Sequence, residues 1–193
     1  MPLCQEKEAA VEHDEELYRR FLAGEQAAYD ELMIRYGDSL TVYLNGYIHN
    51  WHDAEDLMIE AFARIMVKRP KIRDGGFKAY LYKTARNLTS RFSANNKRAT
   101  VFGLDEISED ISSEERTEEG FLDGEKKAAL HFCLGKIDPL LKEALWLVYC
   151  EDLSYDQAAA VMGENRKRID HLLTRGKEQM RKELAKEGII NAY

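Results

Sequence analysis

The stretch from Leu153 to Leu184 constrains the fold most, because it predicts two helices separated by only a short break. Ser154 is the predicted N-cap of the first helix, and Gln157 follows three residues later, which is the pattern of a capping box. Gly163 is typical of a helix C-terminus, and Asn165 is the predicted cap of the second helix. Two helices joined by so short a turn indicate a helix-turn-helix, whose second helix enters the major groove of DNA.

The second of these helices is apolar on one face and cationic at its start. Its apolar positions recur every three or four residues, at Ile169, Leu172, Leu173, Gly176 and Met180. Its candidate DNA contacts fall on the other faces, at Arg166, Lys167, Arg168, His171 and Arg175. The alternative is a basic hairpin that only packs. An Arg-Lys-Arg start after a helix rich in small residues favours DNA binding.

The chain as a whole is predicted to be all-α. Its 193 residues suffice for one large or two small domains, prolines occur only at positions 2, 70 and 139, and no stretch alternates as a strand would. No apolar run is long enough to span a membrane and no signal peptide is recognisable, so we expect a cytoplasmic protein without membrane insertion. Cys4, Cys133 and Cys150 form no Cys-x-x-Cys pair and are expected to be buried, reduced thiols.

Charge and periodicity divide the chain into four segments. Residues 1–16 are acidic and predicted to be a flexible N-terminus, followed by a helical domain over 17–98. Residues 99–125 carry ten acids against a single arginine, which indicates an acidic linker with a charge of −9. Helical periodicity resumes over 126–187 and includes the helix-turn-helix. The sequence therefore predicts two small helical domains joined by an acidic linker.

A cationic helix is predicted in the first domain after Pro70, from Phe77 to about Phe92. Six Lys or Arg residues and no acid lie between Phe77 and Arg98, with aromatic residues among them, although the whole chain has a net charge of −7. Cations interleaved with rings are what single-stranded nucleic acid binding requires. With the preceding loop, the candidate contacts are Arg73, Asp74, Phe77, Tyr80, Lys83, Arg86, Asn87 and Arg91.

A metal site and an enzyme are two alternatives for the first domain. His49, His52 and Asp56 share the start of a helix that Asp53 is predicted to cap, and the nearby acids suggest a metal-dependent hydrolase. No second group of ligands occurs at suitable spacing, and neither a phosphate-binding loop nor a nucleophile motif is present. We therefore expect no metal, no cofactor and no catalytic residue.

Four stretches in order resemble bacterial sigma factors of the sigma-seventy superfamily, in particular the small extracytoplasmic-function group. They are Tyr-Asp-Glu-Leu-Met-Ile-Arg-Tyr (29–36), Asp-Ala-Glu-Asp-Leu (53–57), Phe-Lys-Ala-Tyr-Leu-Tyr-Lys-Thr-Ala-Arg-Asn (77–87) and Leu-Ser-Tyr-Asp-Gln-Ala-Ala (153–159). The resemblance covers nearly everything from Leu17 to Leu184. It implies a region two domain, a region four domain and no enzymatic activity.

The resemblance also implies partners. Core RNA polymerase would bind the helix with Asp-Ala-Glu-Asp-Leu through Asp56, Ile59 and Glu60. The loop and cationic helix after it would recognise and open the −10 element of promoter DNA, and the helix-turn-helix would bind the −35 element. An anti-sigma factor is a further partner that the resemblance suggests. The remaining alternative is a helix-turn-helix regulator that acts without polymerase, but it leaves the first domain without a role.

Overall fold

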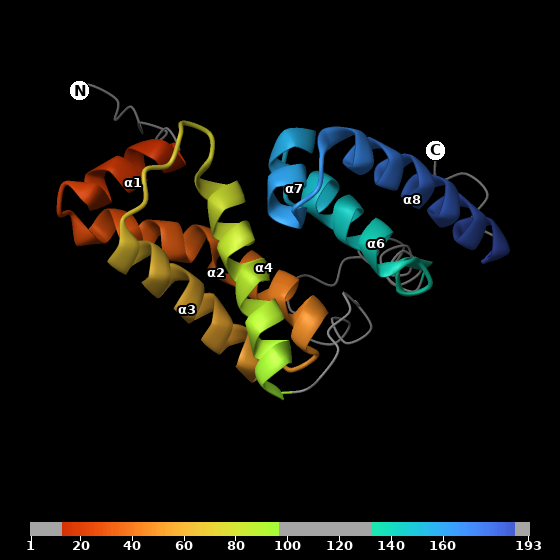
Figure 1. The fold of residues 1–193 in the computed structure, drawn as a ribbon, viewed down its shortest axis with the longest axis horizontal. Helices are drawn as coiled ribbons and strands as arrows, with labels where there is room; N and C mark the ends of the chain where they lie inside the picture. Colours follow the sequence, from red (N-terminus) through yellow and green to blue (C-terminus); the bar gives the residue numbers. More distant parts are fainter. Residues whose placement is uncertain (1–12, 97–132, 188–193) are drawn as a thin grey trace, which may run out of the picture.

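The computed structural model describes residues 13–96 and 133–187, which form two helical lobes (Figure 1). The first lobe consists of α1 (Asp14–Leu22), α2 (Gln26–Ile48), α3 (Trp51–Lys68) and α4 (Phe77–Asn96). The second consists of α6 (Pro139–Leu145), the π-helical turn η1 (Trp146–Cys150), α7 (Tyr155–Met162) and α8 (Arg166–Lys186). Within these two ranges no strand occurs, and the all-α prediction is confirmed. The predicted linker, 99–125, lies outside the described residues.

Two helix boundaries of the first lobe differ from the prediction. Gly24 separates α1 from α2 with a φ of 104°, but Gly37 lies inside α2 and does not interrupt it. A Cβ at Gly37 would lie 3.9 Å from the Met58 side chain, so this position lets α3 pack closely. The cap of α3 is Asn50, whose side chain accepts a hydrogen bond from the Asp53 backbone, rather than Asp53 itself.

The N-terminal prediction is wrong for its last residues. Asp14 begins α1, and its carboxylate accepts hydrogen bonds from Arg35 Nη1 at 2.6 Å and from the Tyr36 hydroxyl. These bonds connect the first turn of α1 to α2. The flexible segment predicted over residues 1–16 therefore ends before Asp14, and residues 1–12 lie outside the described part of the chain.

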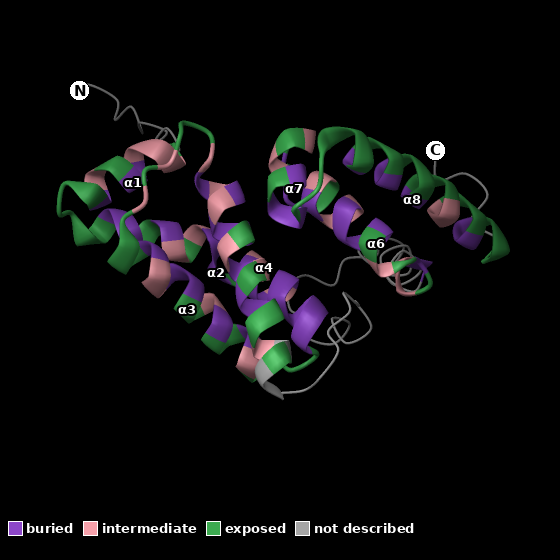
Figure 2. Cartoon of the chain, viewed as in Figure 1, coloured by how far each residue is buried: buried purple, intermediate pink, exposed green. Residues whose placement is uncertain are grey.

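Aromatic rings fill much of the first lobe's core, which Figure 2 shows along the inward faces of the helices. The ring of Tyr29 lies 4.5 Å from Phe21 and 5.8 Å from Phe62, measured between centroids. Its hydroxyl donates to the Phe62 carbonyl across the lobe. Such rings remove large apolar areas from water and hold α4 in a defined position on α2 and α3.

The helix-turn-helix of the second lobe follows its local sequence signals. Ser154 and Gln157 form both bonds of the capping box, Gly163 ends α7 with a φ of 72°, and Asn165 accepts from the Arg168 backbone. At Gly176 an added Cβ would lie 3.0 Å from Leu145 Cδ1, so α8 approaches α6 closely there.

The two described cysteines differ in exposure. Cys133 is buried, whereas Cys150 is exposed at the end of η1, so the prediction of buried thiols is wrong for Cys150. Neither forms a disulfide. Cys4 lies outside the described residues.

The lobes are in contact. Helix α4 of the first lobe packs along α7 of the second, and the buried apolar side chains of both lobes form one continuous cluster (Figure 1). The contact places the cationic helix between its own lobe and the helix-turn-helix.

Candidate nucleic-acid interface

Helix α4 presents one polar row beside α3. The two helices enclose a groove of about 140 Å³. Its lining includes three of the predicted contacts and two cations of α3: Arg64, Ile65, Lys68, Tyr80, Thr84, Asn87 and Arg91. The groove thus combines an aromatic ring and an amide with three cationic side chains, which suits a base and its flanking phosphates.

Arg64 and Lys68 are contributions that the sequence analysis missed. They lie one turn apart on α3, and only the crossing of α3 and α4 brings them beside Asn87 and Arg91. Arg64 is partly neutralised by Glu60, at 2.5 Å, whereas Lys68 and Arg91 form no ion pair with the described residues. The one sequence signal was their cationic pair just before Pro70.

A second polar face of α4 points to the other lobe. Arg86 Nε lies 2.7 Å from Glu143 Oε1, and the Tyr43 hydroxyl donates to the same oxygen at 3.0 Å. Lys78 Nζ lies 3.1 Å from Glu151 Oε2. Both carboxylates are buried, so the predicted strand contact Arg86 is occupied by an acid of the second lobe.

The electrostatics of this face favour the charged pair. Burial disfavours the charged guanidinium, but the hydrogen bond and charge of Glu143 raise the pKa of Arg86 above its ordinary value. Burial, and then the adjacent Glu143 carboxylate, raise the pKa of the Tyr43 hydroxyl. Tyr43 therefore stays a neutral hydrogen-bond donor to Glu143.

The loop before α4 is a tight turn with two exposed side chains, Arg73 and Asp74. Gly75 has a φ of 74°, and a Cβ at Gly76 would lie 2.8 Å from the Arg73 carbonyl oxygen. The two glycines are thus required by the turn itself. The Gly75 amide donates to Glu15 at 2.6 Å, so it is not available to a base in this structure.

Phe77 belongs to the core. It is 1% exposed, and its ring lies 5.3 Å from Tyr18 and 6.1 Å from Tyr36. We therefore remove Phe77 from the candidate contacts, because a base cannot reach the ring without displacing α1. Lys83 is exposed and keeps its place among them.

All predicted −35 contacts are exposed on α8: Arg166, Lys167, Arg168, His171 and Arg175. The opposite face of the helix is buried at Ile169, Leu172 and Leu173. Arg166 donates to Asp156 at 2.8 Å and lies over the Tyr155 ring. This exposed pair connects the start of α8 to α7 and leaves Lys167 and Arg168 toward solvent.

The predicted polymerase contacts share the exposed side of α3. Asp56 and Glu60 are exposed acids, and Ile59 is an apolar side chain with 53% of its surface exposed. Exposed acids around an exposed apolar side chain are consistent with a protein-binding face.

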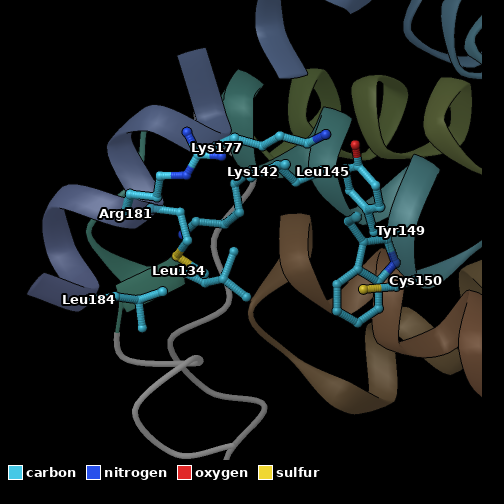
Figure 3. A pocket seen from close by; sticks show the side chains of 10 residues that line it. Leu134, Lys142, Leu145, Tyr149, Cys150, Lys177, Arg181 and Leu184 are labelled. Atoms are coloured by element: carbon cyan, nitrogen blue, oxygen red, sulfur yellow. The ribbon is translucent and has the colours of Figure 1, made fainter. Parts of the chain in front are cut away.

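A larger hollow, of about 520 Å³, lies between α6, η1 and α8 (Figure 3). Its lining is Leu134, Lys142, Leu145, Trp146, Tyr149, Cys150, Lys177, Met180, Arg181 and Leu184. None of the predicted contacts is among these residues.

Two further observations concern the described residues only. They contain no group of three His, Cys, Asp or Glu side chains placed to hold a metal ion, and His49, His52 and Asp56 form no such group. None of their helices combines the length and apolar character needed to cross a bilayer.

Known proteins show the same two parts. The chain matches the family Sigma-70 region 2 over residues 32–99 and the family Sigma-70, region 4 over residues 127–180. These ranges contain the α4 groove and the helix-turn-helix, respectively.

Three curated relatives are sigma factors. The chain is 29% identical to the ECF RNA polymerase sigma factor SigE of Mycolicibacterium smegmatis, an alignment covering 84% of this chain and 65% of SigE. It is 29% identical to the RNA polymerase sigma-H factor of Pseudomonas aeruginosa, covering 78% and 83%. It is 28% identical to the ECF sigma factor BldN of Streptomyces coelicolor, covering 78% and 58%. The matched part thus spans less than two thirds of SigE and of BldN.

Solved structures share the fold. CnrH, solved in complex with the cytosolic domain of CnrY, superposes with a TM-score of 0.57 at 21% identity, covering 86% of this chain and 94% of that chain. The sigma factor RpoE of Bartonella quintana, solved with the anti-sigma factor NepR, gives 0.57 at 19% identity, covering 81% and 96%. With both family regions in order and ECF relatives along most of its length, the chain belongs to the sigma-70 family, in its extracytoplasmic-function group.

Proposed function

We propose that this chain is a sigma subunit that directs core RNA polymerase to promoters and helps to open the DNA. The observation that carries the proposal is the pairing, in one chain, of an exposed helix-turn-helix with a groove of cations, ring and amide on α4. The first reads duplex DNA at the −35 element, and the second binds the unpaired strand at −10. On this proposal the chain acts in the cytoplasm and has no enzymatic activity of its own.

The groove has the parts that strand separation needs. Stacking a base on an aromatic ring such as Tyr80 is worth about 1–3 kcal/mol, comparable with the cost of unstacking it. Asn87 offers both donors and acceptors to a base edge, while Lys68 and Arg91 neutralise phosphates on either side. Arg73 and Asp74, exposed at the adjoining loop, extend this surface. The groove therefore favours a single strand over a duplex.

The partners follow from the exposed faces. Core polymerase binds α3 through Asp56, Ile59 and Glu60, and promoter DNA binds α4 and α8. The solved relatives RpoE and CnrH were captured with NepR and CnrY. We extend this to an anti-sigma factor as a third partner of the present chain.

Run-off transcription tests the function directly. The full chain is added to bacterial core RNA polymerase on fragments of the source genome, and the 5′ ends of the transcripts are sequenced. We expect initiation at a discrete set of sites that share upstream sequence. A helix-turn-helix regulator acting without polymerase would add no start sites to those of core enzyme alone, and that result would refute the proposal.

The polymerase face is tested by Ile59→Asp. An exposed apolar side chain at an interface centre is worth about 2 kcal/mol or more, so this variant should bind core polymerase about 30-fold more weakly. Val67→Asp is the matched control, since Val67 is on the same helix and 78% exposed. Equal binding of both variants would remove Ile59 from the interface.

A further inference from the structure

Two buried carboxylates of the second lobe bind two cations of α4. Glu143, on α6, is 1% exposed and pairs with Arg86, while Glu151, after η1, is 3% exposed and pairs with Lys78. A carboxylate offers a cation the same charge-assisted bonds as a phosphate. In this arrangement, the second lobe occupies the cations of α4 in the way that a nucleic-acid strand would.

The same lobe also covers the loop before α4. Gln157 Nε2, on α7, donates to the Gly75 carbonyl at 2.5 Å. Gly75 lies next to Asp74 in the turn that begins the candidate −10 surface. Contacts from α6, η1 and α7 therefore converge on one side of that surface, while the groove beside α3 remains open.

The closed arrangement is incompatible with binding both promoter elements. Centres at −10 and −35 are about 25 base pairs apart, or about 85 Å along B-DNA at 3.4 Å per pair. Lobes in direct contact cannot span that distance, so they must separate. The 36 residues at 97–132 have a fully extended reach of about 120 Å, which permits the separation.

We propose that the contact between the lobes is autoinhibitory, with Glu143 and Glu151 withholding Arg86 and Lys78 from the DNA strand until the lobes separate. The proposal rests on the proposed strand-binding role of α4. Closed lobes bind a strand through the groove alone, and open lobes add two phosphate contacts. A strand that binds the open form more tightly shifts the chain toward it.

The test neutralises both acids in the full chain, as Glu143→Gln/Glu151→Gln. Glutamine keeps the volume and an acceptor for Tyr43 and Arg86, but it leaves the two cations buried without a counter-charge, which destabilises the closed form. Binding of fluorescent dT12 is measured by anisotropy, and the separation of the lobes by small-angle X-ray scattering. We expect a larger radius of gyration and binding at least about fivefold tighter, the lower end of coupling between sites.

Glu178→Gln/Glu187→Gln is the matched control. It removes the same charge from surface pairs with Lys182 and Lys136 that lie away from the contact. If tighter binding reflects only a less negative protein, this control will bind dT12 as tightly as the test variant. That result would overturn the proposal.

The wild-type chain provides a second measurement, which is independent of how well the variant folds. Saturating dT12 should increase its radius of gyration, and a chain that stays compact when saturated would refute autoinhibition. The two proposals fail differently. If the lobes open and binding is unchanged, but Lys68→Ala/Arg91→Ala weakens binding, the contact is not inhibitory and α4 still binds DNA. If the groove variant has no effect either, the strand-binding role itself is wrong.

Discussion

The groove between α3 and α4 predicts a specific change in the salt dependence of strand binding. Lys68 and Arg91 line it and form no ion pair with the described residues, so each can neutralise one phosphate. Each phosphate contact with a single strand contributes about 0.7 to the slope of log affinity against log salt. Lys68→Ala/Arg91→Ala should therefore reduce the slope by about 1.4. Between about 50 and 200 mM salt, the double variant should lose about sevenfold less affinity than the wild type.

The assay is an anisotropy titration of dT12 with the full chain at four salt concentrations. Lys182→Ala/Lys186→Ala is the control, because it removes two cations from the far end of α8, where both pair with neighbouring acids. Its slope should stay close to the wild-type value. An unchanged slope in the groove variant would mean that no phosphate lies between α3 and α4. An equal change in both variants would mean that only the net charge matters.

Three further predictions concern stability and the −35 contact. Burial raises the pKa of Tyr18 to about 12 and raises those of five other buried tyrosines, so the native state holds more protons than the unfolded chain above pH 10. The urea midpoint should then fall from pH 10 upward, by about 1.4 kcal/mol of stability per pH unit for each such tyrosine, and a flat profile would contradict this. Ser154→Ala removes the cap of α7 and should cost about 1 kcal/mol in urea unfolding, more than Ser90→Ala on the exposed side of α4. Arg166→Ala/Lys167→Ala should weaken initiation at promoters with a −35 element, with about 1–3 kcal/mol lost for one base contact, and unchanged base preference would exclude these residues from readout.

Local signals predicted the helix-turn-helix closely. Ser154 bonds with Gln157, and Asn165 with the backbone of Arg168, so each cap and its partner are only three residues apart in sequence. Such interactions depend on residue type and spacing alone. Where two residues compete for one role, the rule is weaker, and Asn50 rather than Asp53 caps α3.

Contacts between distant segments could not be predicted in this way. Glu143 lies 57 positions after Arg86, and nothing in the sequence around either residue indicates the other. Phe77 was an equally good candidate for core or contact until α1 was seen to place Tyr18 against its ring. The cationic pair of α3 joined the site only through the crossing of two helices. Sequence reasoning identified α4 as the strand-binding element, and tertiary packing decided which of its faces is open.

The rotation of a helix explains how α4 can serve two purposes. With 3.6 residues per turn, Tyr80, Thr84, Asn87 and Arg91 fall in one row, which faces α3. Lys78 and Arg86 fall on the opposite side of the buried stripe, toward the second lobe. Because the core separates the two rows, a substitution in one need not disturb the other. The groove row should then set how tightly a strand is held, and the Lys78–Arg86 row should set whether the lobes are closed.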